Sequence, residues 1–453
     1  MHAVSQGRVG RMLDAIGLDT PAARAWAMYD WANSAYATTV AAAVFPIYFV
    51  RVAGAGLPEG RAYTIWTLTN GLALAVSALM GPLLGAVADR LGMTRRFLFG
   101  FAALGIGTSA LLALVGQGEW RLGAFLFSLS LIGFSSANVF YDALLTSVTT
   151  PDKSDRLSAA GYAMGYLGGG LLLVLNVLML RFPQAFGLAA GTAAEALDAP
   201  ATRWGFVAAA VWWFIFTLPM WRTVRSPEDD AVRATGAQPG SIGDVVGGGL
   251  RQLTATLRTA PRHRDLFLFL VAFWLFSDGI GTFQKQAAAY GSEIGLSAIG
   301  IIGALLMTQF AGVPFSFGFG LLARRIGARR SLFIGLWAFT LISLLARFVT
   351  LSWHFYALAF GVAMVQGGTQ ALSRSLFASL VPHGKSAEFF AFFSVSSKFA
   401  GVLGPLLIGL ISLSGVAARE SIVVLVVLFL AGIAVLTRVD FARGRQAALD
   451  AAS

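Results

Sequence analysis

Apolar residues occur in long runs from Trp26 almost to the C-terminus, and short polar or charged stretches separate these runs. A helix needs about 20 apolar residues to cross a bilayer, and twelve of the runs are long enough. The pattern therefore predicts an all-α membrane protein with twelve transmembrane helices. The predicted spans are residues 25–50, 62–88, 96–116, 121–147, 158–181, 204–222, 265–290, 297–323, 330–350, 352–378, 388–413 and 418–438.

The composition excludes a soluble globular protein. Hydrophobic residues make up 57% of the chain and charged residues only 12%, whereas soluble proteins carry roughly 25% charged residues. A net charge of +11 would suit nucleic acid, but Lys and Arg also gather in the cytoplasmic loops of membrane proteins. No nucleic-acid-binding motif is present, so we expect the bilayer and not nucleic acid as the partner. The first apolar run has no clear small-residue cleavage site and is expected to stay as an anchor.

The distribution of basic residues predicts the orientation. An even number of spans places both termini on the same side. With arginines at span ends counted in the adjoining loop, a cytoplasmic N-terminus gives the inner loops and tails 23 Lys and Arg and the outer loops 7. Basic residues favour the cytoplasmic side. We therefore expect a multi-pass protein of the cell inner membrane with both termini in the cytoplasm.

An internal repeat divides the chain into two halves. Gly85-Ala-Val-Ala-Asp-Arg-Leu-Gly-Met-Thr-Arg-Arg96 is followed 235 residues later by Gly320-Leu-Leu-Ala-Arg-Arg-Ile-Gly-Ala-Arg-Arg330. The same loop in each half predicts two six-helix bundles in tandem. The predicted parts are an N-terminal tail at 1–24, a first bundle at 25–222, a linker with an amphipathic helix at 223–264, a second bundle at 265–438 and a tail at 439–453.

The first copy of the repeated loop resembles the conserved loop of the major facilitator superfamily. The matching residues are Gly85, Asp89, Arg90, Gly92, Arg95 and Arg96. The resemblance implies that Asp89 contacts the start of span eleven near Ser386 in one conformer and releases it in another. In the second copy, Arg324 stands in place of the acidic residue, which argues against the same locking role there.

Motifs within the spans resemble a narrower group, the vacuolar-effluxer-like family of that superfamily. They are Tyr29-Asp-Trp-Ala-Asn-Ser-Ala-Tyr36, Gly165-Tyr-Leu-Gly-Gly169, Ser277-Asp-Gly279 and Gly367-Gly-Thr-Gln-Ala-Leu-Ser-Arg-Ser375. Fungal members of this family are implicated in releasing amino acids from the vacuole. The resemblance therefore implies amino-acid efflux.

Polar and charged residues within the spans are the candidate site. A charge at membrane depth costs about 2.5–3.5 kcal/mol on insertion scales. We therefore expect each charge within a span to have a functional or structural role. Spans one, four, seven and ten line the central cavity in proteins that share this fold, and each carries a polar stripe. The predicted substrate and coupling-ion path consists of Asn33, Tyr36, Asn138, Tyr141, Asp278, Thr282, Lys285, Gln366, Gln370 and Lys398. The predicted inner gate consists of Asp30, Asp142, Arg374 and Glu388.

Two interpretations of these stripes stay open. Asp278, near mid-bilayer, is our sequence-based candidate for carrying a coupling proton. Polar groups also hold membrane helices together, at about 0.6 kcal/mol each. An Asp278–Lys285 or Glu388–Arg374 pair would serve that purpose equally well. Glycines of span five such as Gly165 are expected to allow close helix contact, and Pro82 and Pro405 are expected to kink their helices.

The sequence lacks the marks of an enzyme. Its four histidines have no metal-ligand spacing, and no serine lies in a nucleophile elbow, so we expect no metal and no cofactor. We predict a monomeric secondary active transporter that moves a small polar organic solute by alternating access, with coupling to protons. One alternative is a non-transporting membrane sensor or assembly partner. The other is a drug or lipid exporter, which would need an apolar cavity and not the polar stripe of span ten.

Overall fold

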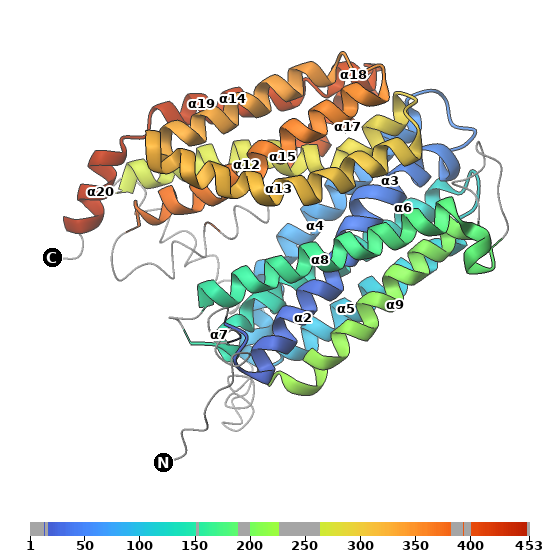
Figure 1. The fold of residues 1–453 in the computed structure, drawn as a ribbon, viewed down its shortest axis with the longest axis horizontal. Coiled ribbons are helices and arrows are strands. Elements are labelled where there is room, and N and C mark those ends of the chain that lie inside the picture. The colour runs from blue at the N-terminus through green and yellow to red at the C-terminus, as the bar shows by residue number, and fades with distance from the viewer. Residues whose placement is uncertain are drawn as a thin grey trace. The chain divides into compact units, whose positions relative to one another are not determined.

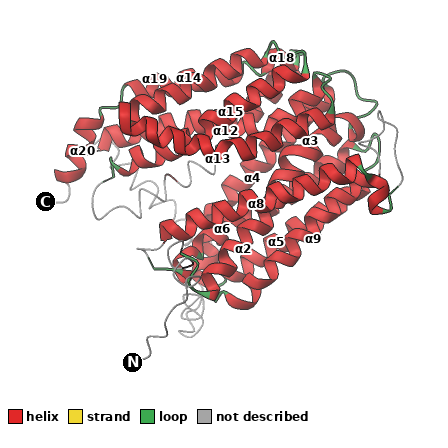
Figure 2. Cartoon of the chain, viewed as in Figure 1, coloured by secondary structure: helices red, strands yellow, loops and turns green. Residues whose placement is uncertain are grey.

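The computed structural model of the chain is built from helices. It describes residues 13, 17–150, 154–188, 200–225, 263–381, 393 and 400–450, and these contain no strand (Figure 2). The long helices follow one another in Figure 1, and short π- and 3-10 segments extend some of them. Their bounds are α2 (Pro21–Ala35), η1 (Tyr36–Val44), α3 (Phe45–Tyr48), η2 (Phe49–Ala53), α4 (Arg61–Leu91), α5 (Thr94–Leu111), η3 (Leu112–Leu114), α6 (Trp120–Ala143), α7 (Leu145–Val148), α8 (Ser154–Arg181), η4 (Pro183–Phe186), α9 (Pro200–Thr223), α12 (Arg264–Glu293), α13 (Ala298–Ile326), α14 (Ala328–Ala346), α15 (Ser352–Ala378), α17 (Leu403–Leu413), α18 (Ala418–Ser421), α19 (Val424–Thr437) and α20 (Phe441–Asp450).

The helix bounds agree closely with the predicted spans. For example, the span predicted at 352–378 is α15, and the span predicted at 62–88 is α4. In the described part of the chain, nine helices are long and apolar enough to cross a membrane, and two shorter apolar helices accompany them. Only the second half of the span predicted at 388–413 is described, as α17. The count of twelve therefore stays a prediction.

The helices form two compact units. The first consists of Met1–Phe45 and Leu79–Leu250, and the second of Pro46–Ala78 and Arg251–Ser453. The second unit thus contains the far end of the first span and most of α4, together with the C-terminal half of the chain. The bundle boundaries predicted from the repeat, 25–222 and 265–438, place residues 46–78 in the first bundle. These boundaries stay a prediction.

The two repeated loops adopt a common backbone feature. Gly92 has a φ of +57° and Gly327 a φ of +91°. A residue with a side chain rarely adopts such a φ, so glycine is required where the chain turns from one helix into the next. The helices α5 and α14 begin within two residues of these glycines. The repeat seen in the sequence is therefore also a repeat of turn geometry.

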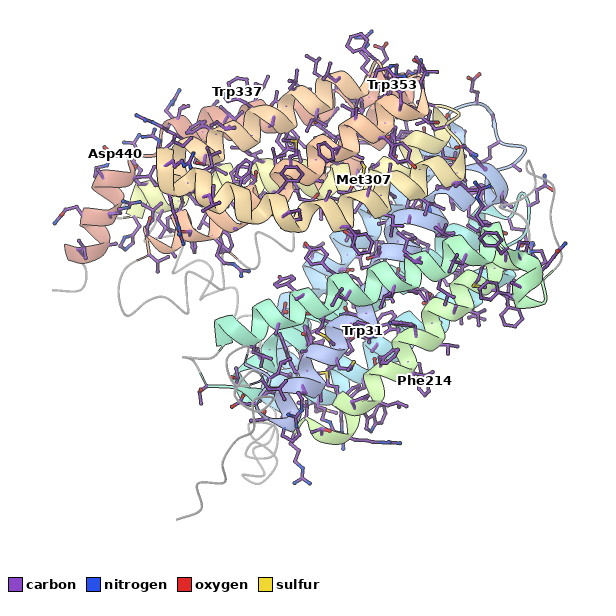
Figure 3. All side chains as sticks on the ribbon, viewed as in Figure 1. Trp31, Phe214, Met307, Trp337, Trp353 and Asp440 are labelled. Atoms are coloured by element: carbon purple, nitrogen blue, oxygen red, sulfur yellow. The ribbon has the colours of Figure 1, made fainter. Side chains whose placement is uncertain are left out.

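Large apolar side chains cover much of the surface of each unit. Phe214 of the first unit and Trp337 and Trp353 of the second are each more than half exposed (Figure 3). Apolar surface of this extent would aggregate in water, whereas it is at no disadvantage against lipid tails. The exposed apolar side chains agree with a membrane-spanning protein.

Glycines bring α8 against α2 in the first unit. A Cβ added to Gly165 would stand 2.6 Å from the Ser34 hydroxyl oxygen, and one added to Gly168 would collide with the backbone carbonyl of Trp31. Trp31, labelled in Figure 3, also stacks on Trp212 of α9 with 5.6 Å between ring centroids. The expectation that the glycines of span five allow close helix contact is confirmed.

The close contact between α2 and α8 predicts the effect of adding a methyl group at Gly168. Gly168→Ala should destabilise the protein by about 1–3 kcal/mol, because the clash is with backbone and the two helices must move apart. Gly107→Ala is the matched control, since Gly107 of α5 has open space where a Cβ would stand. Thermal unfolding of the purified protein in detergent measures both. Equal melting temperatures for the two variants would contradict the close packing.

Some predicted features fall outside the described residues. The amphipathic linker helix lies almost wholly in 226–262, and the inner-gate residue Glu388 and the path residue Lys398 lie in stretches that are likewise not described. The side chains of Asp89 and Arg90 are also outside the description. The roles predicted for these residues stay predictions.

The C-terminal tail predicted at 439–453 contains a helix, α20 (Figure 1). Asp440, labelled in Figure 3, accepts hydrogen bonds at 3.0 Å from the backbone N–H groups of Ala442 and Arg443 and so caps the start of this helix. Arg443 also donates two hydrogen bonds, at 2.7 and 2.8 Å, to the Asp265 carboxylate at the start of α12. The tail is therefore attached to the second unit.

Candidate functional site

An aromatic cluster surrounds a carboxylate in the first unit. Trp26 stacks on Tyr141 with ring centroids 4.3 Å apart, and Tyr29 lies 4.9 Å from the same ring. The Trp26 indole donates a hydrogen bond at 3.0 Å to the backbone carbonyl of Tyr141. Beside them, Asp30 Oδ2 and the Tyr141 hydroxyl lie 2.7 and 3.4 Å from the position of a Cβ added to Gly161. Helices α2, α6 and α8 thus place Asp30 next to a tyrosine hydroxyl.

The other path residues predicted in the first unit are mostly buried. Asn33 of α2 donates a hydrogen bond at 2.7 Å to the side-chain oxygen of Asn138 on α6. Tyr36 is fully buried and packs between Phe134 and Trp213, at 5.2 and 5.3 Å. The structure therefore brings the predicted residues of spans one and four together, in contacts that link two helices.

In the second unit, Asp278 caps the start of α17, in the described part of the predicted eleventh span. Its Oδ1 accepts hydrogen bonds from the backbone N–H groups of Gly401, Val402 and Leu403 at 2.6, 2.8 and 3.0 Å, and its Oδ2 accepts one from Gly404 at 2.6 Å. These N–H groups belong to the turn before α17 and to its first residues, where a helix leaves N–H groups unpaired and its dipole is positive. Asp278 is fully buried. Among the described residues, the partner of Asp278 is thus a helix terminus and not another side chain.

The turn itself depends on glycine. Gly401 has a φ of +85°, and a Cβ placed there would stand 2.6 Å from the Lys285 ammonium. Pro405 falls in the first turn of α17, a position where the missing N–H of proline costs nothing. The irregularity expected at Pro405 therefore lies a few residues earlier, at Gly401.

Lys285 lies on the same face of α12 as Asp278, two turns further along the helix. Its ammonium donates a hydrogen bond to the backbone carbonyl of Ala400, at 3.4 Å. In the described part of the chain, no carboxylate oxygen lies within ion-pair distance of it. The Asp278–Lys285 ion pair considered from the sequence is therefore absent from the described contacts, and each residue contacts the 400–404 turn instead.

The predicted residues of α15 lie at different depths. Gln370 and Arg374 are exposed. The side-chain oxygen of Gln366 is buried and has no hydrogen-bond partner in the described part of the chain. Asp142, predicted with Arg374 at the inner gate, is also exposed. In the repeated loop, Arg95 donates to the backbone carbonyl of Trp221 and Arg96 is exposed.

A further contact group, unexpected from the sequence, joins the first span to the seventh within the second unit. Arg51 of η2 donates a hydrogen bond at 2.9 Å to the Ser292 hydroxyl and another to the backbone carbonyl of Leu296. Ser292 lies in the last turn of α12, where carbonyl groups are unpaired and a cation is favoured. In the sequence, Arg51 is one of several charges in loops. Only the structure shows that its partners lie at the end of α12.

The same region brings α4 close to α17. A Cβ added to Gly71 would stand 2.8 Å from Leu406 Cγ, and one added to Gly409 would stand 3.0 Å from the Thr67 hydroxyl oxygen. We call the contacts of residues 46–78 with α12 and α17 the clasp. They explain why this N-terminal segment belongs to the second unit.

Comparison with known proteins identifies the family. The family model described as vacuole effluxer Atg22 like matches residues 59–154 and 146–449. An uncharacterized MFS-type transporter of Bacillus subtilis, YxiO, is 34% identical over 91% of this chain and 93% of its own length. Autophagy-related protein 22 of Yarrowia lipolytica is 29% identical over 65% of this chain, which aligns with 52% of that protein.

Solved structures show the same fold at low sequence identity. A xylose transporter of E. coli, solved in an inward open conformation, matches with a TM-score of 0.61 at 13% identity, over 94% of this chain and 96% of its own. A peptide transporter in complex with sulfate matches with a TM-score of 0.60 at 16% identity, over 92% and 94%. The chain thus has the major facilitator fold, and it belongs to the vacuole effluxer Atg22-like family of membrane transporters.

Proposed function

We propose that this transporter moves a small polar organic solute across the cell inner membrane by alternating access, with both termini in the cytoplasm. Amino acids are the solutes that the family resemblance implies, and efflux is the direction. The bundles predicted at 25–222 and 265–438 would rock against each other during the cycle. In that case a segment that belongs to one bundle by sequence must form and break contacts with the other.

The clasp is the observation that supports this proposal most. Residues 46–78 belong to the predicted first bundle, and yet Arg51 is hydrogen-bonded to Ser292 and Leu296 of the second. Hydrogen bonds that involve a charged group contribute about 1.5–3 kcal/mol each, so a few of them hold a closed state and still allow it to open. With the predicted orientation, the clasp lies at the outer end of the spans.

We assign the coupling proton to Asp30 rather than to Asp278. Both oxygens of Asp278 already accept backbone hydrogen bonds from the 401–404 segment. A proton there would displace at least one of them. For Asp30, no described Lys or Arg lies within ion-pair distance. Asp30 is only partly exposed. A carboxylate without a cation is costly inside a membrane span, and binding a proton removes its charge.

The groups around Asp30 fit this assignment. From α2 the nearest titratable neighbour is Tyr29, and from α6 they are Tyr141 and Asp142. The α8 helix contributes Gly161, and the contact with α9 is aromatic, through Trp31 and Trp212. The described neighbours therefore include a hydroxyl donor and a second acid but no basic group.

Asp30→Asn should abolish the response of transport to an imposed pH gradient, while exchange of solute without a gradient continues. The measurement uses proteoliposomes and a pool of radiolabelled amino acids, with gradients of both signs. Asp142→Asn is the matched control, because Asp142 is exposed on the neighbouring helix. Uptake by Asp30→Asn that still follows the gradient would exclude Asp30 from this role. Retained exchange in that variant would leave the transport proposal intact.

A further inference from the structure

One face of α12 carries polar side chains that take no part in the hydrogen bonds between Asp278 and the start of α17. Thr282, Lys285 and Gln286 follow Asp278 at helical spacings of four, seven and eight residues, so they lie along one side of the helix. Thr282 packs against Gly404, and Lys285 packs against Gly401. This face of α12 therefore packs against residues 400–404, the turn and first residues of α17.

The two charged side chains on this face differ in how many hydrogen bonds they make. The Asp278 carboxylate accepts four backbone N–H groups. The Lys285 ammonium has three donors, and its hydrogen bond to Ala400 is 3.4 Å long. Charge-assisted hydrogen bonds are usually about 2.7–2.9 Å long. In the described part of the chain, Lys285 thus has donors left without an acceptor inside the span.

The neighbours of Lys285 are also short of partners. Thr282 and Gln286 are fully buried. Among the residues that the structure describes, neither the Thr282 hydroxyl nor either polar atom of the Gln286 amide has a hydrogen-bond partner. Each buried unpaired group costs about 1–3 kcal/mol. A hydroxyl, an amide NH₂ and an ammonium on adjacent helical positions supply donors that a carboxylate, with two acceptor oxygens and one negative charge, would satisfy.

We propose that Lys285, together with Thr282 and Gln286, binds the carboxylate group of the transported solute. This proposal rests on the proposed transport function and gives its solute a chemical class, a small organic acid or amino acid. The Lys285 residue is partly exposed, whereas Thr282 and Gln286 beside it are fully buried. Asp278 does not compete for Lys285, because the α17 terminus occupies both of its oxygens.

The test compares solutes that differ only in the carboxylate. A pool of the protein amino acids and a pool of their amides are added to the purified protein, and binding is followed through the thermal unfolding temperature. The acids should stabilise the wild-type protein, and the amides should not. Lys285→Gln should weaken binding of the acids by about tenfold or more, since a charge-assisted contact is lost. Lys285→Arg should restore part of the affinity.

A purely structural Lys285 gives a different result. Lys285→Gln would then melt at a lower temperature without ligand and still bind the acids with wild-type affinity, which would overturn the proposal. Thr282→Val, which keeps the charge, is a second probe and should weaken binding less than Lys285→Gln. Equal stabilisation by acids and amides would also overturn it. Transport of a solute without a carboxylate would overturn this assignment alone, whereas no transport of any solute would refute the proposed function itself.

Discussion

Asp278→Ala is expected to destabilise the protein by about 3 kcal/mol or more, because it leaves four backbone N–H groups without their acceptor inside a membrane span. Asp278 is fully buried, and three of the four N–H groups belong to the buried residues Gly401, Val402 and Gly404. Asp278→Asn keeps one acceptor oxygen and loses the charge, so its effect should be smaller. The measurement is thermal unfolding of the detergent-purified protein.

The control for this prediction is a cap at the surface. Asp440 accepts hydrogen bonds from two N–H groups at the start of α20 and is exposed. Asp440→Ala should cost about 1 kcal/mol, the usual value for an accessible helix cap. If the Asp278 and Asp440 variants lose the same small amount of stability, Asp278 is not a buried cap. Asp278 would then again be a candidate for the coupling proton.

The sequence predicted the helices well because the bilayer sets their length. A run of apolar residues between charged loops is a direct consequence of membrane thickness, and α15 has the bounds that this pattern predicts. The pattern does not report backbone conformation. The turn at Gly401 therefore went unnoticed inside the run at 388–413, although a proline such as Pro405 is the kind of residue that marks the first turn of a helix.

The partners of the charged residues were harder to predict. Asp278 was singled out because a charge in a span is costly, and that reasoning holds. Its partners, however, are backbone groups more than a hundred residues away, and no pattern in the sequence shows them. Arg51 was counted only as a loop charge, yet it joins the first span to α12. The sequence shows which charged residues are costly to place in a membrane span, whereas the fold determines which groups they contact.

The second large effect concerns the clasp. A disulfide between Thr67→Cys and Gly409→Cys should stop transport, since alternating access requires α4 to separate from α17. The positions suit a disulfide, because a Cβ on Gly409 stands 3.0 Å from the Thr67 hydroxyl oxygen and bridged Cβ atoms lie about 3.5–4.5 Å apart. The chain has no cysteine of its own, so the introduced pair is the only one that can form within it.

A second pair controls for the effect of crosslinking itself. Ser34→Cys with Gly165→Cys joins α2 to α8 within the first unit, where the Cβ atoms would lie 3.5 Å apart. These two helices belong to one predicted bundle and should stay together throughout the cycle. This disulfide should therefore leave transport close to the wild-type rate.

The central claim is that the clasp opens and closes during transport, and uptake by these two crosslinked variants tests it most directly. Each variant is reconstituted in liposomes, oxidised, and assayed for uptake of pooled radiolabelled amino acids and organic acids before and after a reductant. We predict that the Thr67–Gly409 pair falls to the level of protein-free liposomes and recovers on reduction, while the Ser34–Gly165 pair keeps transporting. Unchanged uptake by the oxidised Thr67–Gly409 pair, with the disulfide confirmed, would contradict this account.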